Sequence, residues 1–444
     1  MLNPMLRAIT IKDFKSYREA TLPLAPLTML IGANASGKSN AIEAVRLLAW
    51  LARGQRLNEL RRELPAGVRG RVTDLPYHTE SAFTLGCQLA PDGPPDNPIK
   101  GWDNLQITVA VRDADVYLQA EQITGTDQRG KAVELYRTEA ESSEHSVALR
   151  AFYNPFQRGR PPIIPVSDQQ AIFTQLMTPA RFRDSHIQAQ EIIPQVASAY
   201  QQMLAQILFL DPQPAKMRGY SFKVDTLLGS DGSNVSSVLY QLVQDKQESA
   251  ILAFIQALPE QNISAISFIE TPRQEVMLQL TETFGDTAQV RDAALLSDGT
   301  LRVLAVAAAL LTAPVGALVV IEELDNGVHP SRAKHLLDTI QRVAETRQLR
   351  VLLTTHNPAL LNALPDSTLG DVVYCYRDPA TGASCLTRLA AMPRYAELMA
   401  QGKLGELVTL GTLERSVKQP ISDDEVIERN MAWFMQLQES TSES

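Results

Sequence analysis

Gly32-Ala33-Asn34-Ala35-Ser36-Gly37-Lys38-Ser39 is the stretch on which the rest of the chain depends. It fits the pattern G-x-x-x-x-G-K-[ST], in which a glycine-rich turn presents backbone N–H groups to a phosphate. The apolar segment 27–31 before it predicts a buried strand, and the spacing of 40–48 predicts a helix directly after it. A strand, a glycine-rich turn and a helix N-terminus together favour anion binding.

The residues of this loop have separate expected roles. We expect Lys38 to bring a positive charge to the β- and γ-phosphates of a nucleotide, and the Ser39 hydroxyl to bind Mg²⁺. The alternative is a chance match in a loop, which arises in roughly 1–2% of chains of this length, and the flanking strand and helix argue against it. The residues expected to bind the nucleotide are Gly32, Ala33, Asn34, Ala35, Ser36, Gly37, Lys38, Ser39 and Asn40.

The composition is that of a large globular protein. Its 444 residues are 45% hydrophobic, and the length predicts two or three domains. The formal net charge of −9 argues against a protein that coats nucleic acid with its whole surface, but it leaves room for a local basic stripe. Neither a secretion signal nor an apolar stretch long enough to span a membrane is evident, so we expect a cytoplasmic protein without a membrane partner.

The cysteines and histidines suggest no metal centre. Cys87, Cys375 and Cys385 have no metal-binding or redox spacing, so we expect buried, reduced thiols. The six histidines are scattered, and no zinc pattern is formed.

The order of the predicted elements gives an α/β protein with four regions. Residues 1–165 are expected to form an N-terminal lobe with the glycine-rich loop and an antiparallel β part, because 80–150 are rich in alternating β segments. Residues 166–262 predict a helical insertion. Residues 263–365 predict a C-terminal lobe, and 366–444 predict further strands and a helical tail.

Two carboxylates mark a second half of the candidate site. The continuous apolar run 317–321 predicts a parallel strand buried on both faces, and Glu322 and Glu323 follow it. Ligands bind at the carboxyl ends of such strands in open α/β sheets. Because side chains alternate along a strand, one carboxylate can hold Mg²⁺ through water while the other orients the attacking water. The alternative is a strand end at the surface with two solvated acids.

Two further segments carry polar residues at positions suited to an anion. Ser297 and Gly299 precede the apolar helix predicted over 301–311, where a hydroxyl and N–H groups can meet a phosphate. The plainer alternative is an ordinary helix N-cap. The buried strand predicted over 351–355 ends at His356, a position that favours a γ-phosphate sensor, although a single histidine is usually structural.

Residues 50–72 form the most basic stretch of the chain. They carry only Glu59 and Glu63 against six arginines, so they could be a solvated helix face or a contact to DNA, RNA or an acidic partner. The stretch lacks the interleaved aromatic residues that would strengthen the nucleic-acid hypothesis. The six arginines are Arg53, Arg56, Arg61, Arg62, Arg69 and Arg71.

Taken together, these motifs resemble the ABC-type ATPase heads of the RecF/SMC group, and most closely the single-chain, RecF-like and OLD-like bacterial ATPases labelled AAA-type. The resemblance covers 1–50 and 290–365, and more weakly the middle of the chain. It implies an α/β, ABC-type P-loop NTPase head with a mixed β-sheet, an antiparallel β part and a helical lid insertion. The matching segments are Phe14-Lys15-Ser16, Gly32–Ser39, Leu296-Ser297-Asp298-Gly299-Thr300, Glu322-Glu323, Asn326-Gly327-Val328-His329-Pro330 and Thr354-Thr355-His356-Asn357-Pro358.

The resemblance also implies a role for each matching residue, with ATP and Mg²⁺ as cofactors. Lys38 and Ser39 bind phosphate and Mg²⁺, Glu322 takes the Walker B position as a metal ligand, and Glu323 is the catalytic base or positions the water. Ser297 and Gly299 form the signature that contacts the γ-phosphate bound by the opposite subunit. Asp325 lies in the D-loop, and His356 is the switch histidine.

Three positions depart from the family pattern. Asp298 stands where the transporter-type signature has a second glycine. Glu322 stands where Walker B usually has aspartate, which puts the geometry of Mg²⁺ binding in question. Leu324 replaces a proline that is common in relatives.

The function implied by the resemblance is an ATP-hydrolysing switch that forms a head-to-tail homodimer, or a higher homo-oligomer, on ATP. Residues after His356 show no metal-nuclease pattern, so we expect a separate effector, a nuclease or toxin, in bacterial anti-phage defence. The main alternative is a RecF-like DNA repair ATPase that uses the Arg53–Arg71 stretch on DNA. A transporter ATPase is disfavoured by the large insertion at 75–290, and a regulatory module that does not hydrolyse ATP stays open.

Overall fold

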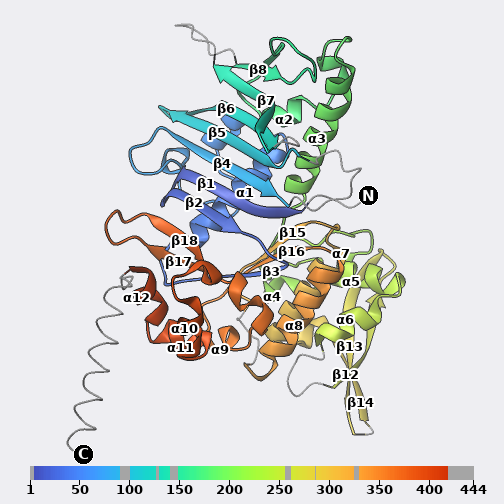
Figure 1. The fold of residues 1–444 in the computed structure, drawn as a ribbon. Coiled ribbons are helices and arrows are strands. Elements are labelled where there is room, and N and C mark those ends of the chain that lie inside the picture. The colour runs from blue at the N-terminus through green and yellow to red at the C-terminus, as the bar shows by residue number, and fades with distance from the viewer. Residues whose placement is uncertain are drawn as a thin grey trace, which may run out of the picture.

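The computed structural model describes residues 5–90, 101–126, 130–140, 149–255, 262–285, 287–324 and 330–418. The predicted D-loop residue Asp325 and the segment 326–329 lie outside these ranges, as do residues 419–444. Three β-sheets and the helices between them make up the described chain (Figure 1).

An antiparallel sheet of eight strands forms the upper part of the molecule in Figure 1. Its strands alternate buried and exposed side chains, as expected for a sheet with one face on the core. Its order is β2 (Tyr17–Pro23), β1 (Leu6–Phe14), β4 (Ala82–Leu89), β5 (Asn104–Arg112), β6 (Asp115–Thr126), β7 (Ala132–Ala140), β8 (Leu149–Tyr153) and β9 (Ile163–Val166).

A second sheet of six strands lies below the first and carries the predicted site strands. All neighbouring strands are parallel except the last pair, which forms an antiparallel hairpin. The carboxyl ends of the strands before the glycine-rich loop, before Glu322 and before His356 therefore meet at one edge. The order is β10 (Leu208–Leu210), β15 (Leu318–Ile321), β16 (Arg350–Thr354), β3 (Leu27–Ile31), β17 (Val373–Arg377) and β18 (Ser384–Arg388).

A small third sheet lies at the lower right of Figure 1. Strand β13 (Glu275–Phe284) pairs on one side with β12 (Ile263–Glu270), and on the other with β11 (Ser221–Phe222) and β14 (Thr287–Asp292). The chain passes from β14 directly into the segment that precedes Ser297. This sheet therefore leads into the predicted signature.

Helices fill the space on both sides of the six-stranded sheet. The longer ones are α1 (Lys38–Ala52), α3 (Ile187–Ala205), α5 (Val235–Gln244), α6 (Glu248–Ile255), α7 (Asp298–Thr312) and α8 (Pro330–Thr346). The shorter ones are α2 (Ile172–Gln175), α4 (Pro214–Met217), α9 (Pro358–Leu361), α10 (Tyr395–Ala400), α11 (Leu404–Thr409) and α12 (Thr412–Lys418). Six short 3₁₀ helices are η1 (Leu57–Arg61), η2 (Val72–Asp74), η3 (Pro179–Arg181), η4 (Ala293–Leu295), η5 (Asp366–Asp371) and η6 (Leu389–Ala391).

The core divides along the six-stranded sheet. Alternate residues of β15 point to opposite faces: Leu318 and Val320 join a core with α1, α3 and the eight-stranded sheet, whereas Val319 and Ile321 join a core with α5 to α8. Every side chain of β3 and β15 is buried. Burial on both faces explains why both strands are almost entirely apolar. Helix α1 is thus packed between the two larger sheets, which fixes the glycine-rich loop at its N-terminus.

The structure confirms the α/β class with both an antiparallel and a parallel sheet. The interval 166–262, for which the sequence predicts a helical insertion, places its elements in different parts of the fold. Helix α3 packs with α1 beside the first sheet, β10 joins the six-stranded sheet, and α5 and α6 pack with α7. In the part of the chain that the structure describes, none of the helices combines the length and the apolar composition needed to cross a membrane.

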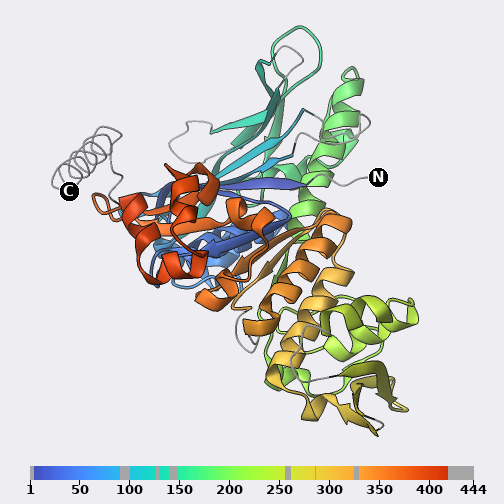
Figure 2. The ribbon, with the colours of Figure 1, turned by 60° about the horizontal axis from the view of Figure 1, so that its bottom comes forward.

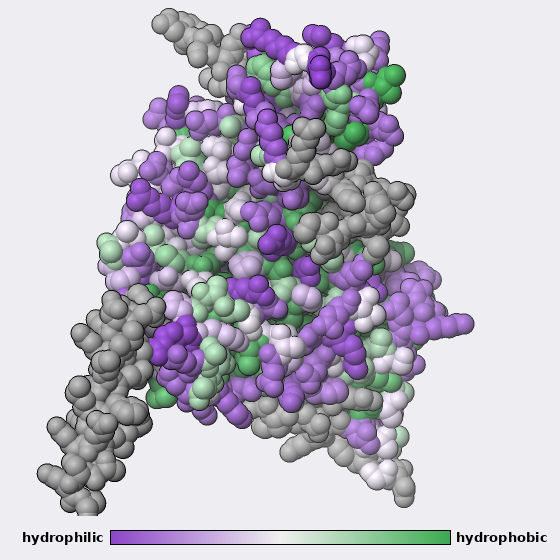
Figure 3. Space-filling view, in the orientation of Figure 1, coloured by the Kyte–Doolittle hydropathy of each residue, from purple (hydrophilic) through white to green (hydrophobic). Residues whose placement is uncertain are grey.

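The C-terminal region folds back onto the N-terminus. Strand β18 lies beside β2, and the Ser384 N–H donates to the Ser16 carbonyl at 2.7 Å. Figure 2 shows the C-terminal hairpin and helices, in orange and red, next to the blue N-terminal strands. On the face seen in Figure 1, the space-filling view shows mostly hydrophilic side chains, with apolar ones in separate small groups (Figure 3). The C-terminal hairpin is therefore an integral part of the lobe that carries the glycine-rich loop.

Candidate nucleotide-binding site

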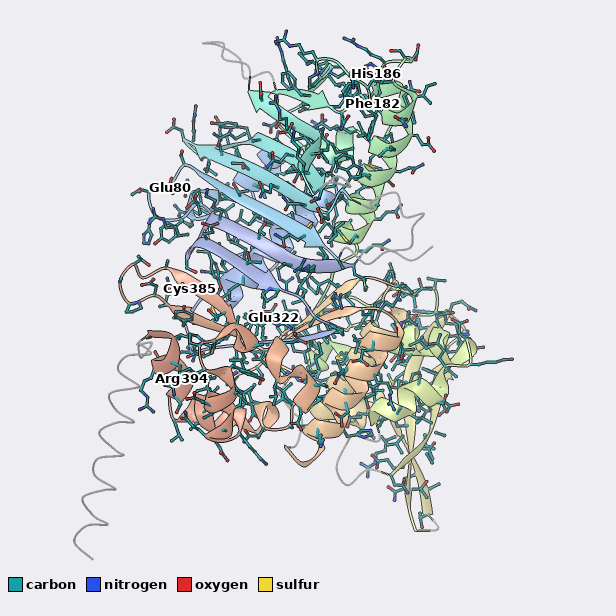
Figure 4. The ribbon with its side chains drawn as sticks, in the orientation of Figure 1. Glu80, Phe182, His186, Glu322, Cys385 and Arg394 are labelled. Carbon is teal, nitrogen blue, oxygen red and sulfur yellow. The ribbon has the colours of Figure 1, made fainter. Side chains whose placement is uncertain are left out.

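One cavity of about 440 Å³ collects most of the predicted site residues. It opens where the carboxyl ends of β3, β15 and β16 meet, and Figure 4 labels Glu322 at this level, in the middle of the molecule. Of the predicted residues, those that line the cavity are Asn34, Ala35, Gly37, Lys38, Ser39, Asn40, Glu322, Glu323 and His356. Gly32, Ala33, Ser36, Ser297 and Gly299 are not among the residues that line it.

Two carbonyl groups of the glycine-rich loop accept hydrogen bonds from hydroxyl groups on the side away from the cavity. The Ser384 hydroxyl donates to the Ser36 carbonyl at 2.6 Å, and the Tyr17 hydroxyl donates to the Gly37 carbonyl at 3.1 Å. In a trans peptide the N–H points opposite to the carbonyl, so these contacts turn the N–H groups of Gly37 and Lys38 away from the hairpin and toward the cavity. Inward-facing N–H groups at a helix start form an anion-binding concavity.

Two glycines let the loop lie this close to its supports. Gly32 and Gly37 have φ angles of 147° and 122°, which other residues rarely adopt. A Cβ atom on Gly32 would lie 2.1 Å from the Cys375 carbonyl oxygen, and one on Gly37 would lie 2.2 Å from the Ser384 hydroxyl. The loop therefore needs glycine at both positions for steric as well as conformational reasons.

Lys38 reaches back over its own loop. Its Nζ donates to the Gly32 carbonyl at 2.6 Å and to the Ala33 carbonyl at 2.9 Å. Burial lowers the pKa of the Lys38 ammonium, because the charged form loses solvation. Both acceptors are neutral, so a phosphate would be a better partner for this charge.

Glu322, the predicted metal ligand, is paired with an arginine of the helix that follows the loop. Arg46 Nη2 donates to Glu322 Oε1 at 2.8 Å, and the guanidinium lies 4.4 Å from the centre of the Phe209 ring. Gly67 packs against the same guanidinium, since a Cβ there would lie 2.8 Å from its central carbon. Arg46 thus connects the end of β15 with β10 and with Gly67 in the basic stretch 50–72.

The oxygen donors at this end of the cavity fit Mg²⁺. Ser39 and Glu322 line the same cavity, and a hydroxyl with one carboxylate is the set that Mg²⁺ uses when phosphates and water complete its shell. Arg46 engages only Oε1 of Glu322, which leaves Oε2 for a cation. The described residues contain no cluster of three or more His, Cys, Asp or Glu side chains that could hold a metal ion without such help.

Glu323 leaves the strand in a different direction from Glu322. Its φ of 53° is left-handed, and its backbone N–H donates to the Thr354 hydroxyl at 3.2 Å. Left-handed conformations of residues other than glycine concentrate at functional sites. Glu323 is exposed and lines the cavity together with Thr355 and His356 from the end of β16.

Lys15, in the family-matching segment Phe14-Lys15-Ser16, does not line the nucleotide cavity. It forms an ion pair with Glu43 on α1 and donates to the Arg69 carbonyl at 2.6 Å. Glu43 is 2% exposed and also accepts from Arg69 Nε at 2.7 Å. This buried carboxylate therefore fastens the loop that carries Arg69, and Arg69 lines the nucleotide cavity.

The predicted signature lies outside the cavity and forms a regular helix start. Ser297 is the N-cap of α7, and its hydroxyl accepts from the Thr300 N–H at 3.1 Å. Arg218 organises the segment from outside: it donates to the Leu296 carbonyl at 2.5 Å and forms an ion pair with Asp298. The N-cap alternative is therefore correct for Ser297 in the single chain, and its contact with a phosphate stays a prediction.

The predicted basic stretch divides into separate environments. Arg61, Arg62 and Arg71 line a second cavity of about 740 Å³, formed mostly by residues 60–73. Arg61 also pairs with Asp115 at 2.5 Å, whereas Arg69 faces the nucleotide cavity instead. Arg61, Arg62 and Arg71 thus line a different cavity from Arg69.

Arg69, Thr354, Thr355 and Arg377 line the nucleotide cavity but were missing from the predicted set. Thr354 and Thr355 directly precede His356, so the end of β16 could have suggested them. Arg69 belongs to the basic stretch, for which the sequence left a solvated face and a contact to DNA, RNA or an acidic partner open. Arg377 has no motif around it, and only the pairing of β17 with β3 brings it to the loop.

Two family descriptions match the chain. The family described as "AAA domain, putative AbiEii toxin, Type IV TA system" matches residues 84–362, and the family described as "AAA ATPase domain" matches residues 5–73. The first match covers more than half of the chain, and the second contains the glycine-rich loop.

Curated relatives match over shorter segments. "DNA replication and repair protein RecF" of Caulobacter sp. (strain K31) is 34% identical over 115 residues, which are 25% of this chain and 28% of the relative. RecF of Gloeobacter violaceus is 56% identical over 45 residues, which are 10% of this chain and 12% of the relative. The chain thus matches less than a third of the length of either relative.

Among solved structures, the chain is similar to SMC heads. An SMC head bound to the C-winged helix domain of ScpA is 14% identical, with a TM-score of 0.46, over 86% of this chain and 98% of that one. The SMC head domain from Thermotoga maritima is 12% identical, with a TM-score of 0.39, over 86% and 98% of the two chains.

Proposed function

The chain belongs to the AAA-domain family that matches residues 84–362, and from this premise we propose that it is an ABC-type ATPase head of the RecF/SMC group, that it binds and hydrolyses ATP with Mg²⁺, and that ATP joins two chains. The observation that supports the proposal best is the convergence of Lys38, Ser39, Glu322, Glu323 and His356 on one cavity. They come from three strand ends far apart in the sequence.

In the proposed reaction, positioning and electrostatics do the work. Lys38 leaves the carbonyls of its own loop for the β- and γ-phosphates, and the N–H groups of Gly37 and Lys38 stabilise charge on the transferred phosphoryl group. Ser39 and Glu322 would hold Mg²⁺, which neutralises phosphate oxygens when it is bound. Glu323 orients the attacking water.

The γ-phosphate side of the site would be completed by a second chain. Ser297 lies outside the cavity that contains Lys38, which is consistent with a signature that acts in the partner's site. Two identical chains related by a two-fold axis would then enclose two ATP molecules. Each Ser297 would meet the phosphate bound by Lys38 of the other chain.

Hydrolysis and assembly are tested with one variant. Glu323→Gln should lower kcat about 10²- to 10⁴-fold, because a positioned base contributes that much, while ATP binding persists. Light scattering after gel filtration should then show a dimer or larger assembly with Mg²⁺ and ATP, but not with ADP. Wild-type hydrolysis in Glu323→Gln contradicts the role of Glu323, and an ATP-independent mass contradicts the proposed pairing.

We propose that the switch controls a separate effector in bacterial defence. The description of the matching family names a toxin and a type IV toxin–antitoxin system, and this supports the assignment. Glu323→Gln would trap the ATP state, so proteins that purify with it from the native host in ATP, and not with Lys38→Ala, are the candidate effectors. Identical partners for both variants would oppose an ATP-controlled effector.

A direct role on DNA is the second candidate, and the cavity lined by Arg61, Arg62 and Arg71 supports it. Phosphate contacts by these arginines predict duplex DNA binding that weakens steeply with salt. Replacing all three by Gln should lower DNA affinity and the salt slope, whereas Arg388→Gln, on the C-terminal hairpin, should change neither. Salt-independent or unchanged DNA binding in the triple variant would exclude this cavity as the contact.

A further inference from the structure

The C-terminal hairpin β17–β18 forms the outer wall of the glycine-rich loop. Its turn is closed by Asp378, whose carboxylate accepts from the Ala380 N–H at 2.7 Å and the Thr381 N–H at 3.1 Å. Ser384 bonds the Ser36 carbonyl, and the Cys375 carbonyl packs against Gly32. The hairpin is thus joined to the loop on both strands.

Arg377 extends from this wall over the tip of the loop. Its Nε donates to the Ala35 carbonyl at 3.1 Å, and Nη1 donates to the Gly382 carbonyl at 2.7 Å in the hairpin turn. Ala35 has a φ of 62°, so the tip is in a conformation that residues other than glycine seldom adopt. The guanidinium therefore has a fixed place at the edge of the nucleotide cavity, which it lines.

Among the described residues that line the nucleotide cavity, Arg377, like Lys38, donates to neutral carbonyls rather than to a carboxylate. Arg69 pairs with Glu43, and Arg46 pairs with Glu322. Among the described residues, no carboxylate pairs with Arg377, and its two acceptors are neutral carbonyls. A guanidinium carries five N–H donors, so three are left for an anion at the cavity.

We propose that Arg377 is a phosphate-binding residue, through which the C-terminal hairpin holds the β- and γ-phosphates of a nucleotide bound by the glycine-rich loop. The inference rests on the proposed ATP binding and adds a ligand from a segment that neither matching family description covers. The planar fork of arginine suits a polyphosphate, because two parallel N–H groups can meet two oxygens. Its bonds to Ala35 and Gly382 place the fork before the nucleotide arrives.

The test measures nucleotide affinity in the full chain. Arg377→Ala should raise the Kd for Mg·ATP and Mg·ADP about 10- to 100-fold, the effect of losing one charge-assisted hydrogen bond. AMP binding, measured by calorimetry, should change less than about twofold. The matched control is Arg388→Ala in the same hairpin: Arg388 pairs with Asp371 and donates to the Gly370 carbonyl at 3.1 Å, outside the cavity, and its loss should leave the Kd unchanged.

Two further measurements separate a phosphate contact from simple support of the loop. Arg377→Lys keeps the charge without the fork, so its Kd should fall between those of the wild type and Arg377→Ala. The dependence of log Kd on log salt should become shallower in Arg377→Ala, because a charged contact is lost. An unchanged salt slope, or a Kd in Arg377→Ala within twofold of the wild type, overturns the inference. If the wild type itself does not bind ATP, the proposed function fails together with the inference. If the wild type binds ATP and only the Arg377 results fail, the inference alone is wrong.

Discussion

Two helix N-termini in this chain were predicted as anion sites, and the structure builds them differently. Helix α1 begins after Gly37, which has no side chain to cap it, and its first turn carries no acidic residue. Helix α7 begins after Ser297, whose hydroxyl accepts from the Thr300 N–H, and its first turn contains Asp298. The first start is thus open to an external anion, whereas the second has supplied a cap and an anion of its own.

The difference shows which of the two sites a single chain can use. An open helix start with inward N–H groups can bind phosphate without displacing a side-chain cap. At α7 an incoming phosphate would compete with the Ser297 cap and meet the charge of Asp298, which Arg218 partly neutralises. The contrast favours a sequence of events in which α1 binds ATP first and α7 acts only when a second chain brings it to the phosphate.

A third helix start is capped by a carboxyl group from another element of the fold. The buried carboxylate of Glu121 on β6 accepts from the Ile172 N–H at 2.7 Å and the Phe173 N–H at 2.6 Å at the start of α2. Tyr136 donates its hydroxyl to the same carboxylate at 2.5 Å. Here a side chain from another element plays the part that phosphate would play at α1.

The largest effect should come from changing the open start. Lys38→Ala should weaken ATP binding by the single chain about 100-fold or more, because a half-buried charge partner of the phosphates is removed. Ser297→Ala should change that affinity less than twofold, since Ser297 is outside the cavity. Titration with a fluorescent ATP analogue at concentrations that keep the chain monomeric measures both.

Ser297→Ala also provides the control for assembly. It should abolish ATP-dependent pairing in the Glu323→Gln background while leaving the first binding step intact. If Ser297→Ala weakens binding by the single chain as much as Lys38→Ala does, the two helix starts belong to one site and the comparison fails.

The next effect concerns Glu121 and pH. Burial, offset in part by its three hydrogen bonds, raises the pKa of this carboxyl from 4.5 to about 7. A carboxyl with a raised pKa stabilises the fold fully below pH 4.5 and loses that contribution as pH rises through 7, which amounts to about 3 kcal/mol. The free energy of unfolding of the wild type, measured with urea between pH 4.5 and 8, should include this decrease.

Two variants isolate the contribution of Glu121. Glu121→Gln cannot titrate, so the fall should disappear, although the variant should be less stable than the wild type at low pH because its amide NH₂ group faces one of the two backbone donors. Glu80→Gln, at an exposed glutamate just before β4 (Figure 4), should keep the full fall. An equal fall in Glu121→Gln would show that other groups cause it.

The sequence predicted those parts of the site that depend on local order. The glycine-rich loop, its strand and its helix are contiguous, and the apolar runs before Glu322 and His356 favour buried strands of a parallel sheet, which the structure confirms. Parallel strands share one carboxyl edge, so the convergence of these residues follows from the class of fold.

The rest of the site depends on contacts between distant segments. The Arg46–Glu322 ion pair joins residues 276 positions apart, and Arg377 reaches Ala35 only because β17 pairs with β3. Nothing in the local pattern of 166–262 says that α3 packs on one sheet while β10 inserts into another. Tertiary packing decides such questions, and periodicity alone cannot report them.

A smaller effect should come from the cap of α7. Ser297→Ala removes the acceptor of the Thr300 N–H, and the loss of an N-cap costs about 1 kcal/mol of stability. Ser297→Asp keeps an acceptor and should restore most of that loss, as measured by urea unfolding, while the added negative charge should still prevent ATP-dependent pairing. If Ser297→Asp pairs as well as the wild type, phosphate does not approach this helix start.

The smallest effect should come from Asp298. Its replacement should lower the stability of the fold and strengthen ATP-dependent pairing. Asp298→Asn removes a favourable charge at the start of α7 and its ion pair with Arg218, which costs less than about 1 kcal/mol at an exposed site. The same change removes a charge that repels an incoming phosphate, so ATP-dependent pairing of Glu323→Gln should become about two- to fivefold tighter. Arg218→Gln leaves Asp298 unneutralised and should weaken pairing by a similar factor. If both variants shift pairing in the same direction, Arg218 and Asp298 act by shaping the segment around Ser297, and the charge of the second helix start is not what keeps phosphate away from the single chain.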